Sequence, residues 1–397
     1  MSDVAHLTPR RADFNPKPLG VSAILIITGA WYLAQTVNAR QAALYLVGVL
    51  LGIVFYHAAF GFTSAWRVFI ADGRGAGLRA EMVMLAVAVA LFFPVLAAGS
   101  LFGVPVKGRV VPVGIPVAIG AFMFGVGMQL ADGCAIGTLY TVGGGGTRKI
   151  VTLAAFIAGA FLETAHMAFW AALPGLKAFS LIKGLGVWLA LAANWLVFAA
   201  IAALTIYIER RRHGQLVEPH GSTARNASTW LRGPWPLMAG AVALAVLNFV
   251  VLALSGQPLV LTSAFALWGG KMAAALGVDV GSWSSWASKD QAAALAAPVS
   301  HDVNTVIDVG IVLGGMLATA LAGRYSPVWR LPARLLVAAV VGGMLLGYGA
   351  KLAYGCTIAA YFSGIVSGSL HAWLWLVAAF LGNVLGTRLR PLFGLEV

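Results

Sequence analysis

The chain has 397 residues, of which 60% are hydrophobic and only 10% are charged. Soluble domains carry about 25% charged residues, so this composition excludes a soluble globular enzyme and a disordered protein. Two cysteines cannot form a disulfide framework. The net charge of +13 is spread between long apolar stretches rather than gathered with aromatic residues, so no nucleic-acid partner is expected.

Ten apolar runs follow one another along the chain, and each is long enough to cross about 30 Å of hydrocarbon as a helix. They lie near residues 19–37, 42–62, 80–102, 111–131, 149–173, 185–208, 235–255, 303–322, 333–353 and 370–389. The expected fold class is an all-α integral membrane protein with about ten transmembrane helices plus short broken helices. The first 18 residues are polar and the following run lacks a clear cleavage pattern, so we expect no secretory signal.

A polar, arginine-rich stretch divides the chain into two membrane halves. The expected organisation is an N-terminal tail at 1–18, a first membrane half at 19–208, a linker at 209–234 and a second membrane half at 235–397. Ten spans place both ends on one side, and that side carries more than twice as many Lys and Arg residues as the other. Because basic residues accumulate in the cytoplasm, both termini and the linker are predicted to be cytoplasmic.

The two halves contain similar segments. Residues 125–136 (GVGMQLADGCAI) share Gly, Leu, Ala, Cys and Ile positions with residues 347–358 (GYGAKLAYGCTI), and the Thr-Ser-Ala run at 63–65 recurs at 262–264. The second half has an extra stretch near 277–302. The matching segments would cross the membrane in opposite directions, which is the pattern of an inverted-topology repeat. Such a fold brings them together near the middle of the bilayer.

The Gly133-Cys134 and Gly355-Cys356 pairs are the main candidates for a functional site. Each pair precedes a short, glycine-interrupted apolar piece, and such broken helices occur at membrane depth where they line a cavity. A short helix that starts at Gly-Cys would direct free N–H groups at this cavity, which favours an anion and strong S–H donation. Soft sulfur donors suit a sulfur-bearing anion better than sulfate or phosphate.

Other interpretations of these residues stay open. The cysteines could be buried thiols that only pack, or could form a disulfide. Neither has a His or Cys at metal-ligand spacing, so no metal site, cofactor or catalytic residue is predicted. Ser64 and Ser263, in the two Thr-Ser-Ala runs, could cap short helices or touch a substrate.

Further polar side chains inside the spans have structural explanations. We expect Asp132 to face the cytoplasmic surface or to pair with a base, and Glu163 to pair with His166. Most tryptophans are expected to anchor helices at the membrane interface. The remaining polar groups are expected to form helix-packing hydrogen bonds, namely His57, Asn194, Asn304, Asp308 and Asn383. Four glycines are expected to let neighbouring helices approach each other closely, namely Gly120, Gly125, Gly343 and Gly347.

At these motifs the chain resembles the YeeE/YedE family of bacterial inner-membrane proteins. The matching segments are GFTSAWR at 61–67, LADGC at 130–134, LAYGCTIAAYFSG at 352–364 and SLHAW at 369–373. The resemblance extends from residue 42 to residue 390, through both halves, and the paired Gly-Cys elements are rather specific.

The resemblance implies a multi-pass permease of the bacterial inner membrane, not an enzyme. Its substrate would be a small sulfur-containing anion, with thiosulfate uptake as the best-known activity and a selenium-linked branch beside it. It also implies that Cys134 and Cys356 pass the anion along by S–H···S contacts. Many members have a further cysteine directly before the Phe-Thr-Ser-Ala-like run, where this chain has Gly61. Thr63 or Ser64 could supply a hydroxyl donor there instead, or the substrate could differ from thiosulfate.

Two other classes of function are left open by the sequence. One is a membrane thiol sulfurtransferase, or a selenium- or sulfur-trafficking protein, that works with a cytoplasmic partner through a persulfide on Cys134. The other is a structural subunit whose thiols only pack. The chain has no G-x-x-x-x-G-K-[ST] motif, so energy for uptake is expected from a gradient or from trapping by a cytoplasmic sulfur-carrier protein.

Overall fold

The computed structural model describes residues 14–216 and 227–397, most of them in helices. Ten segments are long and apolar enough to cross a membrane, and they coincide with the ten predicted runs. The predicted all-α membrane fold is therefore confirmed. Most of the predicted N-terminal tail and the middle of the predicted linker lie outside the described residues.

The helices fall into long spans and short pieces. The long helices are α1 (Pro16–Thr36), α2 (Ala39–His57), α4 (Ala76–Ala98), α5 (Ile115–Ala131), α7 (Thr147–Ala171), α9 (Val187–His213), α11 (Leu237–Ser255), α14 (Val303–Leu321), α15 (Ala333–Leu352) and α17 (His371–Leu389). The short helices are α3 (Phe62–Asp72), α6 (Ala135–Gly143), α8 (Leu181–Leu185), α10 (Ala227–Arg232), α12 (Thr262–Ala275), α13 (Lys289–Ala296) and α16 (Ser363–Val366). A π-helical turn, η4 (Thr357–Phe362), leads into α16. The predicted broken helices are thus present.

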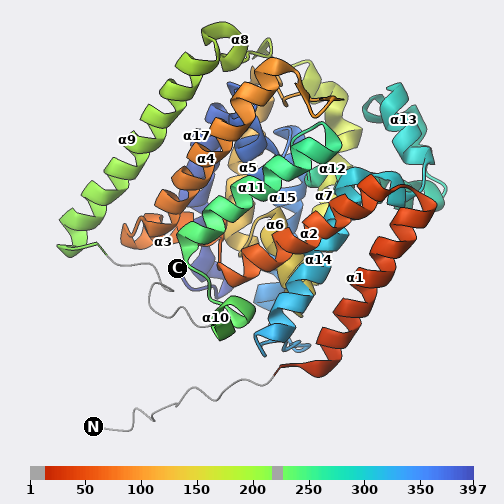
Figure 1. Ribbon diagram of the computed structural model, residues 1–397, viewed down its shortest axis with the longest axis horizontal. Helices are drawn as coiled ribbons and strands as arrows, with labels where there is room; N and C mark the ends of the chain where they lie inside the picture. Colours follow the sequence, from red (N-terminus) through yellow and green to blue (C-terminus); the bar gives the residue numbers. More distant parts are fainter. Residues whose placement is uncertain (1–13, 217–226) are drawn as a thin grey trace.

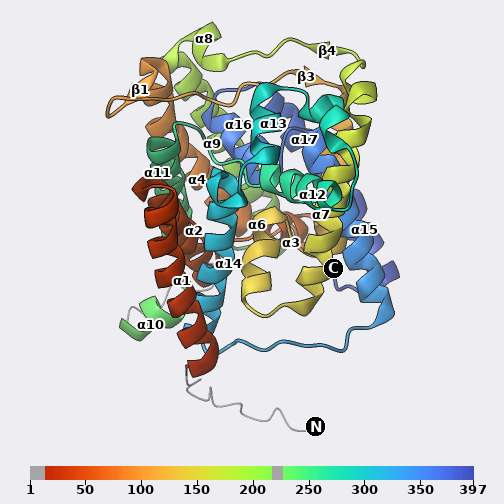
Figure 2. The ribbon, with the colours of Figure 1, turned by 90° about the vertical axis from the view of Figure 1, so that its right-hand side faces the viewer.

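Short ribbons and turns cover one end of the bundle (Figure 2). The strands β1 (Ser100–Leu101) and β2 (Val104–Pro105) form one antiparallel pair, and β3 (Val113–Gly114) and β4 (Gly175–Leu176) form another. The extra stretch of the second half folds as α13 with the 3-10 turns η1 (Val280–Ser282), η2 (Ser284–Trp286) and η3 (Val299–His301). A last 3-10 turn, η5 (Arg390–Phe393), follows α17.

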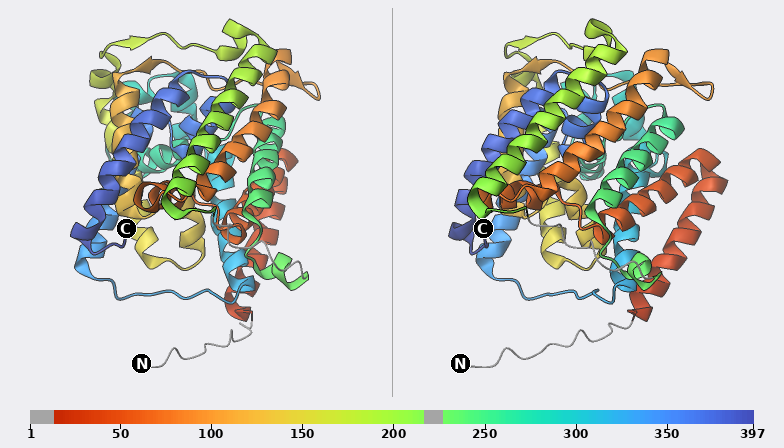
Figure 3. Two further views of the ribbon diagram at one scale, coloured as in Figure 1. Left: turned by 90° about the vertical axis from the view of Figure 1, so that its left-hand side faces the viewer. Right: turned by 60° about the vertical axis from the view of Figure 1, so that its left-hand side comes forward.

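Five long helices stand side by side in a row that runs from α9 through α4, α11 and α2 to α1 (Figures 1 and 3). The other long helices pack behind this row, with α5 against α17 and α15, α7 against α15, and α14 against α2. The outermost helix α1 exposes the large apolar side chains of Ile24, Ile27 and Trp31. Such a surface fits lipid rather than water.

Two of the inner helices, α5 and α15, lie against each other and run in opposite directions (Figure 2). α5 starts at the end of the bundle that carries the ribbons, and it continues through a bend into α6. α15 starts at the opposite end and continues into η4 and α16. The two bends therefore approach the middle of the bundle from opposite ends.

Glycines allow the inner helices to pack backbone against backbone. A Cβ added at Gly125 of α5 would collide with the Ala379 carbonyl oxygen of α17, and one at Gly347 of α15 would collide with the Phe156 carbonyl oxygen of α7. These positions have the close-approach role expected from the sequence. The helices that hold the two bends are thus fixed tightly to their neighbours.

Candidate functional site

Cys134 lies where α5 ends and α6 begins. Asp132 ends α5 in a left-handed conformation with φ of 58°, and its N–H donates to the Met128 carbonyl. Cys134 is then the N-cap residue of α6. Its sulfur lies close to the backbone N–H groups of Ile136 and Gly137. The short helix that starts at the first Gly-Cys pair is therefore present as predicted.

Cys356 lies in the corresponding bend after α15. Tyr354 is left-handed with φ of 60°, and Gly355 has φ of 152°, a conformation that residues with a Cβ rarely adopt. Cys356 is the N-cap residue of η4. Its sulfur lies close to the backbone N–H groups of Ile358 and Ala359. Both thiols therefore face the free N–H groups of a helix start.

The two cysteines are buried and lie near each other. Cys134 has φ and ψ of −86° and −173°, and Cys356 has −87° and −168°. Their residues are 2% and 0% exposed. Both are free thiols, so the alternative of a disulfide is wrong. The two thiols lie within electrostatic range of each other, and the Thr357 hydroxyl lies beside the Cys134 thiol. That hydroxyl has no hydrogen-bond partner within the described part of the chain.

A cavity of about 180 Å³, the Cys134 pocket, lies at the first bend. Its lining includes four of the predicted site residues, Gly61, Ser64, Gly133 and Cys134, together with Arg67. Gly61 is the N-cap residue of α3, and the Ser64 hydroxyl donates to the Gly61 carbonyl at 3.0 Å. The N-terminal turn of α3 thus places a hydroxyl and a guanidinium at the same cavity as the thiol.

A second cavity of about 130 Å³, the Arg109 pocket, lies at the other bend. The predicted residues Ser263 and Gly355 line it, and so do the cationic side chains of Arg109 and Lys351. The Ser263 hydroxyl donates to the Val260 carbonyl at 2.8 Å, as Ser64 does to Gly61 in the first half. All seven predicted site residues therefore lie in or beside the two bends.

Asp132 is neutralised by two arginines at the first bend. One of its oxygens accepts from Arg67 at 2.6 Å and from Arg390 at 3.0 Å, which confirms the expected pairing with a base. The Lys149 ammonium donates to the Ala131 and Asp132 carbonyls at 2.7 and 2.6 Å. These contacts hold the end of α5, and they leave the bend with more positive than negative side chains.

Arg109 holds the second bend in a similar way. Its guanidinium donates to the Tyr354 carbonyl at 2.6 Å, while its own N–H donates to the Ser367 hydroxyl at 2.8 Å. The Nε atom is buried and has no hydrogen-bond partner among the described residues. Burial lowers the pKa of Arg109, and the nearby Cys356 and Tyr354 groups oppose that shift. Arg109 therefore keeps one buried N–H group without a partner among the described residues.

The expected pair of Glu163 and His166 is wrong. The His166 ring lies 3.0 Å from the Tyr348 hydroxyl of α15, and Glu163 lines the Arg109 pocket, where its charged neighbour is Lys351. Helical spacing placed the two side chains on one face of α7. Partners from the adjacent α15 compete successfully for both of them.

Sequence reasoning also missed a cluster of buried aromatic rings. Tyr361 of η4 stacks on Trp375 with ring centres 6.0 Å apart, and Trp66 of α3 meets both rings edge to face. The Trp375 indole N–H donates to the Gly355 carbonyl at 3.2 Å. Trp66 and Trp375 are fully buried, so they are exceptions to the expectation that most tryptophans anchor helices at the membrane interface. This cluster packs α3 against the second bend.

The other polar groups divide into two kinds. Asn304 accepts from the Val260 N–H, and Asn383 accepts from Gln129, so both form the expected packing hydrogen bonds. Asn194 instead bonds within its own helix. Asp308 departs from expectation, because neither carboxyl oxygen has a partner among the described residues, and the same is true of His57 Nδ1. Within residues 14–216 and 227–397, no three His, Cys, Asp or Glu side chains are grouped to hold a metal ion.

Comparison with known proteins matches this chain to membrane transporters. A family model described as "Sulphur transport" matches residues 57–385. The probable transporter YedE of Salmonella typhimurium is 31% identical over 172 residues, which are 43% of this chain and 42% of that protein. The probable transporter YedE of Escherichia coli is 29% identical over 171 residues, or 42% of this chain and 41% of that protein.

A third relative aligns over most of its length. The thiosulfate transporter TsuA of Spirochaeta thermophila is 28% identical over 353 residues, which are 85% of this chain and 95% of that protein. The matches to the two YedE relatives, by contrast, cover less than half of those proteins.

Proposed function

Because the chain belongs to the sulphur transport family, we propose that it is a permease that imports a small sulfur-containing anion past Cys134 and Cys356, with thiosulfate as the substrate. The observation that carries this proposal is the pair of neighbouring buried thiols at two helix starts, each beside a pocket. The name of the relative that aligns over 95% of its length supports thiosulfate.

The Arg109 pocket would receive the anion. Arg109 Nε lacks a partner in the described structure, and the Lys351 ammonium and Ser263 hydroxyl line the same cavity. Charged donors hold an anion more strongly than neutral ones, so a dianion would be concentrated there. Gly355, the next residue along the path, offers no side chain that would narrow it.

Beyond Gly355 the donors become weaker. The Cys356 thiol, the Thr357 hydroxyl and the Cys134 thiol lie near one another, and each can donate one hydrogen bond. Weak donors in series hold an anion long enough to exclude others and release it readily to the next site. A sulfur-bearing anion gains S–H···S contacts that a fully oxygenated anion cannot form as well. Selectivity in this proposal therefore comes from the two thiols.

The Cys134 pocket would release the anion. Arg67 and the Ser64 hydroxyl line this cavity with Cys134 and Gly133. A Cβ at Gly61 would lie 2.7 Å from the Ser64 hydroxyl oxygen, so a side chain at position 61 would displace that hydroxyl. We propose that Ser64 takes the place of the third thiol that many family members carry before the Phe-Thr-Ser-Ala-like run.

We further propose that the halves 19–208 and 235–397 are inverted repeats. Asp132 and Tyr354, at matching positions, are both left-handed, and the packing of α5 on α17 corresponds to that of α15 on α7. The distribution of Lys and Arg then places both termini, the linker and the Cys134 pocket on the cytoplasmic side of the bacterial inner membrane. Import would run from the Arg109 pocket to the Cys134 pocket.

Uptake of radiolabelled thiosulfate into proteoliposomes tests the proposal. We expect uptake by the purified wild type, and at least a tenfold loss in Cys134→Ala and Cys356→Ala without loss of folding. Ser255→Ala, at the end of α11 and away from both pockets, serves as the control and should transport normally. Normal uptake by both cysteine variants would refute a path lined by thiols.

The same preparation separates the alternatives. A persulfide found on Cys134 by mass spectrometry after turnover would favour the membrane thiol sulfurtransferase instead. Uptake by the purified protein would show that no cytoplasmic sulfur-carrier protein is required. Uptake of a selenium anion in preference to thiosulfate would place this protein with the selenium-linked branch of the family.

A further inference from the structure

Two buried carboxyl groups take no part in the path described above. Glu81 of α4 is 1% exposed, and Asp308 of α14 is 0% exposed. Each is the sixth residue of its helix, and α4 and α14 occupy corresponding places before the helices that carry the bends. Neither carboxyl forms an ion pair with a described residue. Ionisable groups inside membrane spans are rare and costly, so each requires a role.

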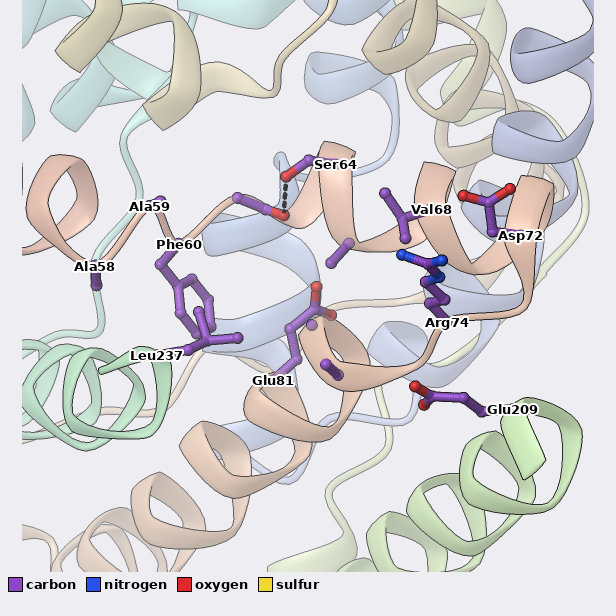
Figure 4. Close-up of a pocket in the computed structure, with 14 residues that line it drawn as sticks. Ala58, Ala59, Phe60, Ser64, Val68, Asp72, Arg74, Glu81, Glu209 and Leu237 are labelled. Carbon is purple, nitrogen blue, oxygen red and sulfur yellow. Dashed lines mark hydrogen bonds between the residues drawn. The ribbon is translucent and has the colours of Figure 1, made fainter. Parts of the chain in front are cut away.

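Glu81 faces a cavity of about 410 Å³ between α3, α4 and α11. Figure 4 shows its carboxyl directed into the space between Phe60, Val68 and Ser64. One oxygen accepts from the Trp66 indole N–H at 2.9 Å, and the other has no hydrogen-bond partner in the described structure. A cavity of this size admits several waters beside the Glu81 side chain, although the unpartnered oxygen itself is buried.

The charged neighbours of Glu81 do not neutralise it. Asp72 and Arg74 line the far part of the cavity, and Glu209 of α9 accepts from Arg79 and from the Gly75 N–H. From η4, the Tyr361 hydroxyl interacts electrostatically with Glu81 and has no hydrogen-bond partner among the described residues. The Glu81 carboxyl therefore has no cationic partner among the described residues.

Asp308 lies beside the thiol path. Its ionisable neighbours are Asp302, at the start of the same helix, and the Cys356 thiol. Asp302 is already engaged, because it caps α14 by accepting from Thr305. Both Asp308 oxygens lack hydrogen-bond partners in the described residues. An unpaired buried carboxylate costs several kcal/mol, so the neutral, protonated form is favoured while the site is closed.

We propose that Glu81 and Asp308 bind the protons that are carried with the anion. This inference rests on the proposed transport of thiosulfate. Each carboxyl binds one proton during the cycle, and Glu81, whose cavity shares Gly61 and Ser64 with the Cys134 pocket, releases its proton to the exit side. Two protons balance the two charges of thiosulfate, so the cycle is electroneutral. A metal cation would need several oxygen ligands at one place, whereas each of these carboxyls stands alone.

The contacts connect each carboxyl to the path. Glu81 holds Trp66 of α3, and the same helix supplies Ser64 and Arg67 to the Cys134 pocket. A charged carboxylate holds the indole N–H more strongly than a neutral carboxyl does, so protonation loosens α3. Asp308 acts at Cys356, where a negative charge would repel the anion. Proton binding at both positions thus favours passage of the anion.

Proteoliposomes with a pH-sensitive dye inside and the membrane potential clamped at zero test this inference. Thiosulfate should carry protons into wild-type vesicles, and an inward gradient of one pH unit should raise accumulation about tenfold per proton, or about 100-fold for two. Because one carboxyl remains, Glu81→Gln and Asp308→Asn should each reduce this accumulation from about 100-fold to about tenfold and keep thiosulfate–thiosulfate exchange, while the double variant should lose it. Glu81→Asp, which keeps both carboxyls, should accumulate more than Glu81→Gln. Asp290→Asn, on the exposed helix α13, is the matched control.

The outcomes separate this inference from the proposed function. Exchange of thiosulfate by the wild type without entry of protons overturns proton coupling and leaves the permease intact. Undiminished, about 100-fold accumulation by both single carboxyl variants overturns the assignment to Glu81 and Asp308. Absence of wild-type exchange in folded protein overturns the proposed substrate, and this inference with it.

Discussion

Alanine at Gly355 should damage the protein more than alanine at Gly133, although both glycines precede a cysteine in the same way. Gly355 has φ of 152°, and holding alanine in such a conformation costs about 1–3 kcal/mol. The new Cβ would also overlap the Ala359 side chain and lie 2.7 Å from the Ala360 nitrogen. Overpacking of this kind costs about 1–3 kcal/mol, which brings the total to about 2–6 kcal/mol.

Gly133 is in a different situation. It is not among the residues with positive φ, and its Cβ would meet the end of a flexible side chain, Lys149 Nζ, at 2.8 Å. The flexible ammonium could move aside at the loss of one of its two bonds to the Ala131 and Asp132 carbonyls. A hydrogen bond to a charged group contributes about 1.5–3 kcal/mol, so we expect Gly133→Ala to lose about 1.5–3 kcal/mol.

Thermal unfolding of the two variants in detergent, beside thiosulfate uptake in proteoliposomes, checks this order. At about 2 °C per kcal/mol, Gly355→Ala should lower Tm by about 4–12 °C and Gly133→Ala by about 3–6 °C. Uptake should be lost first in Gly355→Ala, because its bend positions Cys356. Equal Tm values, or a more stable Gly355→Ala, would show that the second bend is not constrained as described.

Three further changes have defined outcomes. Asp132→Asn keeps a residue that tolerates the left-handed conformation, but it removes the carboxylate that pairs with Arg67. With Arg67 free to bind the anion, the Kd for thiosulfate measured by calorimetry should fall about fivefold. An unchanged Kd would show that Arg67 does not face the anion. Arg109→Gln removes a charged donor of the Arg109 pocket, so the KM for uptake should rise about tenfold. Arg109→Lys keeps the charge and should raise the KM less. An unchanged KM in Arg109→Gln would exclude this entry site. Gly125→Val drives a side chain against the Ala379 carbonyl of α17, so this variant should give little monodisperse protein on size-exclusion chromatography. Gly20→Val is the control and should behave like the wild type, because no atom lies near Gly20 on the exposed part of α1.

The spans were predictable because lipid imposes one simple requirement. Every backbone polar group must be bonded internally, so each apolar run of sufficient length forms a helix, and hydropathy alone finds it. The helix starts at Cys134 and Cys356 were predictable from glycine and chain length, because each piece after Gly-Cys is too short to cross. Local sequence therefore determined where the helices break.

Contacts between distant residues were not predictable. Asp132 is paired with Arg390, 258 positions later, and Arg109 donates to Tyr354 across 245 positions. Nothing near either residue indicates its partner. Glu163 shows the opposite failure, because its spacing to His166 favours a local pair that contacts from α15 override. Helix packing, rather than spacing along one helix, thus determines which groups these charged side chains contact.

The glycine contacts between α5 and α17 and between α15 and α7 restrict how the molecule can open. A helix seated on a neighbour's carbonyl groups cannot slide without driving other side chains into that backbone, and packed interiors resist such strain. A rocking motion that separates the two halves would have to break these glycine contacts between helices. α6 is held in the same way, because a Cβ at its Gly143 would collide with the Val312 carbonyl oxygen of α14. We therefore expect the long helices and α6 to act as a fixed frame while α3 and η4 rearrange a few residues at a time. Turnover would then follow the nanosecond-to-microsecond motions of loops rather than the slower motions of whole domains.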